Sequence, residues 1–249
     1  MFPFKKKNTK GWVAKDDNQQ KEMPKAGKIH NLLIVDESGS MRSIYNAALT
    51  GMNETLQSIK NDASENPETQ HEVTLVTFDT EHYNEIFRST PAKEIREITS
   101  KDYQPGGCTP LYDAVGRAVN TLRKNVKENE NVLVTIITDG MENASCEYTI
   151  QDIKALIDEL SEQGWLFTYI GANQDALRVG RSMSINATMN YEANDASMTE
   201  MWVKERNSRS KFYAKHRESG YASTRMMNNS DFFTDDGEDI SKKDDKEKK

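Results

Sequence analysis

The sequence is poor in the residues that build disulfide frameworks and zinc sites. Its 249 residues include only two cysteines, Cys108 and Cys146, with no CxxC motif and no neighbouring cluster of histidines. Disulfide-rich domains and structural zinc sites need several such residues at short spacing, so both classes are excluded and a reducing compartment is expected. The four histidines, to which we assign no role, are His30, His71, His82 and His216.

Long apolar segments are also missing. No stretch is long and apolar enough to span a bilayer. The first twenty residues carry basic side chains without the apolar stretch of a secretory signal peptide. We therefore expect a soluble protein of the cytoplasm.

The chain has no excess of basic charge. Lys and Arg number 33 against 40 Asp and Glu, which gives a formal net charge of −7. A dedicated binder of polyanions carries the opposite excess, so that class is disfavoured. Hydrophobic residues make up 35% and charged residues 29% of the chain, which allows one sizeable core with solvated stretches around it.

Composition divides the chain into three parts. Residues 1–28 are rich in lysine and have too few large apolar groups to offset chain entropy, so they are expected to form a mobile lead-in. Residues 218–249 are expected to be a disordered charged tail, in which Phe232 and Phe233 are candidates for a short motif that docks in a partner's groove. The remaining residues, 29–217, are predicted to fold as one domain.

Within that domain, short apolar runs alternate with stretches of helical period. The runs 32–35 and 132–137 are continuous, as in strands buried on both faces of a parallel sheet. Other strands are predicted at 73–78, 83–87, 165–170 and 188–191, with 83–87 as the antiparallel partner in an edge hairpin. Helices are predicted over 41–59, 111–126, 149–160, 176–179 and 197–215. This alternation predicts a doubly wound, mostly parallel α/β sheet flanked by helices.

Acidic and hydroxyl side chains follow the two continuous runs. They are Asp36, Ser38, Ser40, Thr109 and Asp139. The first three directly follow the 32–35 strand, the threonine lies in a Gly/Pro-rich loop at 105–110, and the last directly follows the 132–137 strand. Open α/β sheets bind ligands beyond the carboxyl ends of their strands, so we expect all five in one crevice. Two carboxylates and three hydroxyls, without a soft ligand, suit Mg²⁺, with Mn²⁺ as a substitute.

The same motifs resemble the metal-ion-dependent adhesion site of von Willebrand factor A domains. The chain has Asp-x-Ser-x-Ser from Asp36, Gly-Gly-x-Thr-Pro around Thr109 and Thr-Asp-Gly around Asp139, so all five positions match. The resemblance covers residues 29–191 and includes YIGANQDA at 169–176, which is similar to bacterial members. It implies a six-stranded sheet of order 3-2-1-4-5-6 with one antiparallel edge strand.

The resemblance also implies how the site works. Ser38, Ser40 and Thr109 would ligate the metal directly, while Asp36 and Asp139 would hold its waters. Neutral hydroxyl ligands leave the cation much of its charge and an open position for an outside oxygen. In this family an Asp or Glu of a partner protein fills that position, and intracellular members often serve as adaptors of assemblies such as AAA+ ATPases. A binding module is therefore expected, and not an enzyme.

Other interpretations of the single pieces stay open. Asp and Ser are favoured at helix starts, so Asp-x-Ser-x-Ser alone suits an N-cap cluster equally well. A Mg²⁺-dependent phosphatase of the haloacid dehalogenase type would need a second Asp where Ser38 stands. Basic residues between 204 and 217 leave open a nucleic-acid-associated factor, although a solvated helix face is favoured. Cys108 is interpreted as a small loop filler, and Glu37 as a source of negative potential only.

Overall fold

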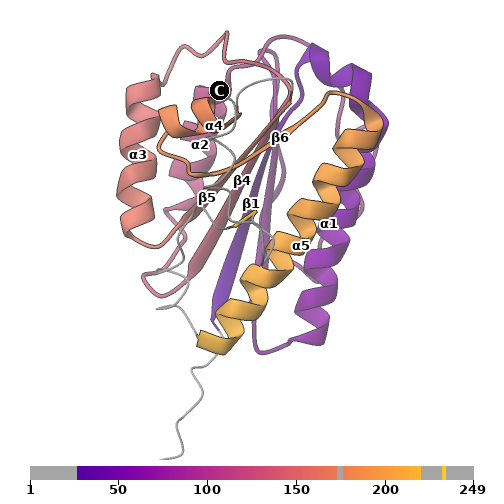
Figure 1. Ribbon diagram of the computed structural model, residues 1–249. Coiled ribbons are helices and arrows are strands. Elements are labelled where there is room, and N and C mark those ends of the chain that lie inside the picture. Colours follow the sequence, from indigo (N-terminus) through magenta and orange to yellow (C-terminus); the bar gives the residue numbers. More distant parts are fainter. Residues whose placement is uncertain (1–26, 173–175, 220–231, 234–249) are drawn as a thin grey trace, which may run out of the picture.

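The computed structural model of the protein describes residues 27–172, 176–219 and 232–233. A six-stranded sheet lies at its centre (Figure 1). The strands are β1 (Lys28–Asp36), β2 (Gln70–Phe78), β3 (Tyr83–Pro91), β4 (Asn131–Thr138), β5 (Leu166–Ala172) and β6 (Ala187–Tyr191). Their order is β3-β2-β1-β4-β5-β6, and every pair is parallel except β2 with β3. The predicted fold class, strand order and antiparallel edge strand are confirmed.

Helices cover both faces of this sheet. They are the 3-10 helix η1 (Gly39–Ile44) and the α-helices α1 (Tyr45–Glu65), α2 (Leu111–Leu122), α3 (Ile150–Glu162), α4 (Ala176–Ser182) and α5 (Asp195–Ser219). The helices α1 and α5 lie on one face, and α2, α3 and α4 lie on the other (Figure 1). This arrangement explains the continuous apolar runs, because the central strands are buried from both sides.

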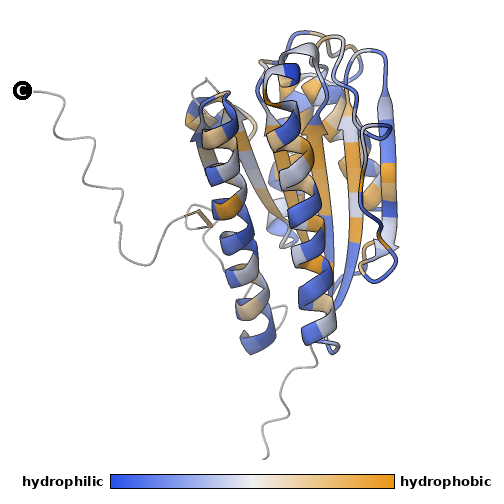
Figure 2. Cartoon of the chain, turned by 90° about the vertical axis from the view of Figure 1, so that its right-hand side faces the viewer, coloured by the Kyte–Doolittle hydropathy of each residue, from blue (hydrophilic) through white to orange (hydrophobic). Residues whose placement is uncertain are grey.

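The central strand β1 divides its side chains between two cores. Leu33 and Val35 pack against α1 and α5, whereas Leu32 and Ile34 pack against α2 and α3. Successive side chains of a strand point to opposite faces, so a strand between two helical layers has no polar face to expose. Figure 2 shows the result, with largely hydrophobic strands inside and hydrophilic outer faces on α1 and α5.

Helix α5 packs closely against α1. The indole of Trp202 lies directly over Gly51 of α1, where an added Cβ would stand 2.0–2.2 Å from three ring atoms. Only a glycine allows two helices to approach in this way through an aromatic ring. Farther along α5, Arg217 pairs with Asp62 of α1 at 2.9 and 3.0 Å, which fastens the other end of the helix.

The basic residues of α5 do not form one solvated face. Arg209 has no exposed surface and pairs with Glu205 one turn earlier in the helix. Its guanidinium also donates to Asn31 of β1 at 3.0 Å and to Thr135 of β4 at 2.9 Å. The expectation of a solvated basic face is therefore wrong for Arg209, because a buried cation needs this full set of acceptors.

The two ends of the chain bear on the expected domain limits. Residues 1–26, most of the expected lead-in, lie outside the described residues, as does most of the expected tail from residue 218. Within that tail, however, Phe232 and Phe233 are only 4% and 7% exposed and join the core beside α5. The hypothesis of an exposed docking motif is wrong for this pair, because their apolar surface packs on the chain itself.

No helix in the described ranges is both long enough and apolar enough to cross a membrane. The formal net charge of −7 is that of all 249 residues, including those outside the described ranges.

Replacing Gly51 with Ala should destabilise the fold. The new methyl group would overlap the Trp202 ring, and such overpacking costs about 1–3 kcal/mol of unfolding free energy. Gln57→Ala, at an exposed position of the same helix, should change it by less than about 0.5 kcal/mol. Urea denaturation of both variants measures the difference, and equal stabilities would contradict the packing of α5 on α1.

Candidate metal site at the carboxyl end of the sheet

The carboxylate of Asp36 occupies the junction between the two central strands. In the parallel register Val35 lies opposite Ile137, so Asp36 and Thr138 end their strands side by side. The Thr138 hydroxyl donates to Asp36 Oδ2 at 2.6 Å, and the Ser38 backbone N–H donates to Asp36 Oδ1 at 2.7 Å. Asp36 has no exposed surface, so it acts as a buried acceptor that fixes the turn after β1.

Two serines of the turn and the aspartate after β4 form a chain of hydrogen bonds. The Oγ atoms of Ser38 and Ser40 are 3.1 Å apart, and Ser40 Oγ donates to Asp139 Oδ1 at 2.5 Å. Ser38 is buried, Asp139 is half-buried and Ser40 is exposed. The chain of oxygens therefore leads from the interior of the sheet edge to its surface.

Thr109 reaches the same place from the loop before α2. A Cβ added at Gly140 would lie 2.6 Å from Thr109 Oγ1 and 3.3 Å from Asp36 Oδ2. The threonine hydroxyl and the aspartate carboxylate thus both border Gly140, and any side chain at this position would collide with the hydroxyl. All five residues singled out from the sequence therefore meet at one edge of the sheet.

The electrostatics of this cluster fit a cation. Burial raises the pKa of Asp36 to about 6, although Thr138 and Ser38 donate hydrogen bonds to it, and the nearby charge of Asp139 acts in the same direction as burial. Burial also raises the pKa of Asp139, against the hydrogen bond from Ser40. Two carboxylates whose ionised forms are disfavoured would be stabilised by a positive ion.

The donor set decides what kind of cation fits. The described residues contain no group of three or more His, Cys, Asp or Glu side chains that could hold a metal. A metal at this edge would therefore depend on the hydroxyls of Ser38, Ser40 and Thr109 in addition to the carboxylates. Oxygen-only sets of this kind suit Mg²⁺ or Mn²⁺ and not zinc or copper.

Glu37 fastens the loop that carries Thr109. Its backbone N–H donates to Phe78 O at 2.8 Å, and its backbone oxygen accepts from Gly106 N at 2.8 Å. Its buried carboxylate accepts a hydrogen bond from the Gln104 backbone N–H. The interpretation of Glu37 as negative potential alone is therefore too narrow, since its side chain is a structural acceptor. The Asp-x-Ser-x-Ser pattern gives no signal for this role.

A glycine and the β2–β3 turn shape the same loop. Gly107 has a φ of +58°, and an added Cβ would stand 2.5 Å from Thr80 Oγ1. That hydroxyl accepts from the Cys108 backbone N–H at 3.0 Å, and Gly107 O accepts from Gly39 N at 3.1 Å. A left-handed backbone in such close contact requires glycine. Cys108 itself is free and exposed.

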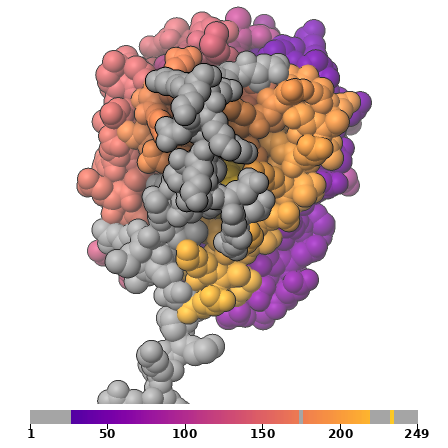
Figure 3. All heavy atoms as spheres, in the orientation of Figure 1, coloured from indigo at the N-terminus to yellow at the C-terminus, as the bar shows by residue number. Residues whose placement is uncertain are grey.

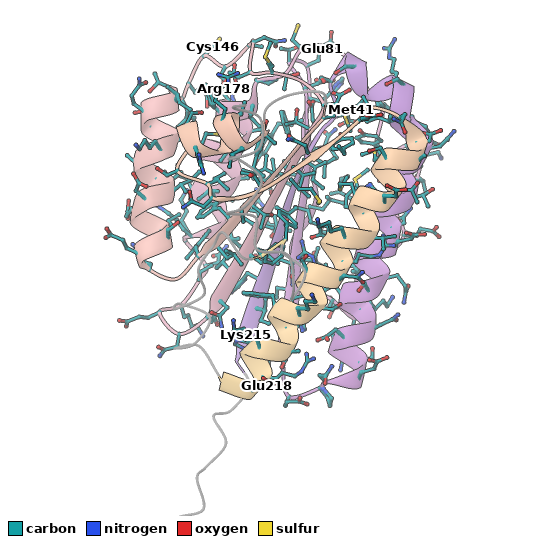
Figure 4. The ribbon with its side chains drawn as sticks, viewed as in Figure 1. Met41, Glu81, Cys146, Arg178, Lys215 and Glu218 are labelled. Atoms are coloured by element: carbon teal, nitrogen blue, oxygen red, sulfur yellow. The ribbon has the colours of Figure 1, made fainter. Side chains whose placement is uncertain are left out.

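The loop after β4 is held by acceptors that the sequence did not reveal. Asn143 receives the Thr109 backbone N–H at 2.9 Å and returns its own N–H to Thr109 O at 3.2 Å. Asp113, in the first turn of α2, accepts from the backbone N–H groups of residues 146, 147 and 148, each at 2.9 Å. Figure 4 shows Cys146 of this loop at the same end of the molecule as Glu81.

Two tyrosines lie beneath the cluster. The Tyr103 hydroxyl donates to the backbone oxygen of Asp36 at 2.9 Å, and its ring stacks on Tyr45. The buried Tyr191 hydroxyl, at the end of β6, has no hydrogen-bond partner within the part of the chain described here. Burial raises the Tyr191 pKa well above its usual value, and the charges of Asp139 and Asp36 add to this effect. Its phenol therefore lies within electrostatic reach of both carboxylates.

A match to a protein-family model identifies the domain family of this part of the chain. Residues 32–142, from β1 to just beyond β4, match the von Willebrand factor type A domain. This part of the chain is a von Willebrand factor type A domain. The match spans all five residues of the cluster, and the recognition of this domain from its sequence motifs is confirmed.

Solved structures share the fold of this type A domain at low sequence identity. Proximal thread matrix protein 1 from the mussel byssus has a TM-score of 0.51, 15% identity, and coverage of 72% of this chain and 45% of its own. A von Willebrand factor type A protein from Catenulispora acidiphila has a TM-score of 0.50 and 14% identity, with coverage of 77% of this chain and 43% of its own. The pilus adhesin SpaC from Lactobacillus rhamnosus GG, in an open conformation, has a TM-score of 0.52 and 14% identity, with coverage of 77% of this chain and 30% of its own.

The chain spans less than half the length of each of these three structures. None of the curated proteins compared with it is significantly similar. The structural likeness therefore establishes the fold of the type A domain and leaves its binding chemistry to the residues themselves.

Substitution of Glu37 tests how the Thr109 loop is held. Glu37→Ala removes the acceptor of the Gln104 N–H, so the backbone amides of residues 104–109 should exchange hydrogen at least roughly tenfold faster. Glu37→Gln keeps one carbonyl oxygen and should exchange nearly as slowly as the unaltered chain. Hydrogen exchange read by mass spectrometry distinguishes the two. Equal acceleration in both variants would mean that the charge of Glu37, and not its hydrogen bond, matters.

Proposed function

We propose that this chain is a Mg²⁺-dependent protein-binding module. In this proposal Ser38, Ser40 and Thr109 ligate one cation, Asp36 and Asp139 hold its waters, and an Asp or Glu of a partner protein completes the shell. Domains of this family commonly mediate protein–protein interaction, so the metal would be the point of contact. The observation that carries the proposal is the meeting of all five oxygen donors at one sheet edge.

The gradient of exposure supports a bridge to an outside group. Asp36, Ser38 and Thr109 are almost fully buried, whereas Ser40 is exposed at the rim. Just beyond the cluster, Met141 is 66% exposed. A cation at the outer end of the oxygen chain would have protein ligands on its inner side and an open outer side, which suits an incoming carboxylate.

An apolar contact next to the metal would help to select the partner. Exposed Met141 lies two residues after Asp139, and methionine adapts its flexible side chain to varied apolar surfaces. A partner with an apolar side chain near its acidic residue would therefore be favoured. An adaptor role in a larger assembly, such as one built on an AAA+ ATPase or a stress-response complex, is consistent with this mode of binding.

Catalysis is not part of this proposal. A metal-dependent hydrolase needs an activated nucleophile or a positioned base beside the ion. The side chains of the cluster are instead engaged with one another, as in the bond from Ser40 to Asp139. The position that a dehalogenase-type phosphatase fills with a second aspartate holds Ser38.

The nucleic-acid alternative would rest on the exposed Lys204, Lys211 and Lys215 of α5, because the arginines of this helix are engaged within the chain. Three of its arginines make ion pairs within the chain: Arg206 with Glu54, Arg209 with Glu205, and Arg217 with Asp62. A helix that contacts phosphates presents its cations outward.

The two described cysteines are free and exposed, which supports the proposal of a reducing, cytoplasmic location.

Metal binding should depend on Asp36. Titration calorimetry with Mn²⁺ or Mg²⁺ should show one weak site per chain, because water and partner oxygens complete much of the shell. Asp36→Ala should abolish the heat of metal binding, since it removes the carboxylate that orients Ser38 and Thr138. Glu81→Ala, which removes an exposed acid at the same end of the molecule, is the control and should bind like the unaltered chain. Unchanged binding by Asp36→Ala would place the metal elsewhere.

Partner capture should depend on the Thr109 hydroxyl. Thr109→Ala deletes one proposed ligand but little core, so the melting temperature should fall only modestly while Mg²⁺-dependent capture of partners from cell extract is lost. Thr109→Ser retains the hydroxyl and should retain capture. The comparison needs both thermal melting and pull-downs with Mg²⁺ and with chelator. Capture by the Ala variant equal to that of the unaltered chain would rule out a bridge through this residue.

A further inference from the structure

The phenol of Tyr191 is a buried polar group to which the proposed site gives no role. The residue ends β6, is 6% exposed, and belongs to the apolar cluster on the side of α1 and α5. Among the residues that the structure describes, none forms a hydrogen bond with its hydroxyl. Buried hydroxyls nearly always have a partner, so an unpaired one indicates a place that a bound ion or its water can complete.

The register of the sheet brings Tyr191 level with Asp139 of the proposed site. Thr138 of β4 lies opposite Gly171 of β5. The next residue of β5, Ala172, lies opposite Tyr191 of β6. Asp139 directly follows Thr138, so Asp139, Ala172 and Tyr191 succeed one another across three neighbouring strands. The alanine between the other two projects only a methyl group, which separates a carboxylate from a phenol less than a larger side chain would.

Asp139 and Tyr191 also lie on the same side of the sheet. Ile137 of β4 packs in the core of α1 and α5, and strand side chains alternate, so Asp139 two residues later returns to that side. The hydrogen bond that Asp139 accepts from Ser40 of η1, directly before α1, agrees with this. Helix α5 begins at Asp195, soon after β6, and its atoms adjoin those of α1 at the surface (Figure 3). The phenol and the carboxylate therefore share one helical layer.

The electrostatics agree with this geometry. Burial raises the pKa of Tyr191 well above its usual value, and the charge of Asp139 adds to this effect more than that of Asp36. The phenol therefore stays protonated at neutral pH and keeps a proton to donate. Tyr103 already donates its own proton to the backbone oxygen of Asp36 at 2.9 Å, whereas the proton of Tyr191 has no acceptor in the described part of the chain.

We propose that Tyr191 is a positioning residue of the metal site, and that its hydroxyl hydrogen-bonds to the water shell of the cation on the side held by Asp139. This inference rests on the proposed function, because it needs the cation that Ser38, Ser40 and Thr109 would bind. The site then draws on three strand ends, since β6 joins β1 and β4. A hydroxyl that gains its partner only with the ion favours the loaded state, because the cost of leaving it unpaired falls on the metal-free chain alone.

Tyr191→Phe tests this role, because it removes the hydroxyl and keeps the ring. The metal-free variant should melt no lower than the unaltered chain, since no hydrogen bond is lost. Its affinity for Mn²⁺ in titration calorimetry should fall roughly tenfold or more, as for other groups that orient the surroundings of a metal. The rise in melting temperature that Mn²⁺ causes should shrink accordingly. A purely structural phenol would instead lower the metal-free melting temperature on substitution.

Tyr83→Phe is the matched control. The Tyr83 hydroxyl, on the edge strand β3, is likewise buried without a hydrogen-bond partner in the described ranges. The charges that shift its pKa most are those of Glu85 and Arg117, away from the carboxylates of the site. Tyr83→Phe should therefore bind Mn²⁺ as tightly as the unaltered chain.

The outcomes separate this inference from the proposed function. If the unaltered chain binds Mn²⁺ and Asp36→Ala does not, three results would overturn the inference alone: unchanged Mn²⁺ affinity in Tyr191→Phe, an equal loss of affinity in Tyr83→Phe, or a lower metal-free melting temperature of Tyr191→Phe. Failure of the unaltered chain to bind Mn²⁺, or binding that survives Asp36→Ala, would overturn the proposed function and this inference together.

Discussion

The buried carboxylate of Asp36 is the constraint on which the candidate site depends. It ends the central strand, accepts one hydrogen bond from the neighbouring strand through Thr138 and another from the turn through Ser38. Tyr103 holds its backbone oxygen from below. A buried carboxylate without these donors would be costly, so strand end, turn and supporting loop must be in place together. The positions of Ser38 and Ser40 follow from this junction.

The rest of the site is assembled by side chains that accept backbone N–H groups. Glu37 fixes the loop of Thr109, Asn143 ties that threonine to the loop after β4, and Asp113 anchors the far end of that second loop. Loops without regular hydrogen bonds need such acceptors to keep one shape. The oxygen cluster is therefore held in place by the protein, so little reorganisation would be needed to admit a cation.

Sequence patterns predicted the fold and the cluster of five oxygen donors, but not the side chains, such as Glu37, that hold the loops of the cluster in place. Continuous apolar runs at 32–35 and 132–137 predict parallel strands because burial on both faces leaves no alternation, and the polar residues that follow them must then share a sheet edge. Glu37 gives no comparable signal, since its partner is a backbone group 67 residues away. The burial of Arg209 and of Phe232 likewise depends on contacts between segments far apart in the sequence. Composition alone places Arg209 on a solvated helix face and Phe232 in a charged tail.

A crystal grown with Mn²⁺ tests the central claim most directly, because anomalous scattering locates the ion without assumptions about its ligands. The account predicts one peak beside the Ser38 and Ser40 hydroxyls at about 2.1 Å, the distance at which Mg²⁺ binds oxygen ligands, with Asp139 within reach of its waters. A structure that binds Mn²⁺ only at other carboxylates, or that leaves these serines paired with each other in excess Mn²⁺, would contradict it.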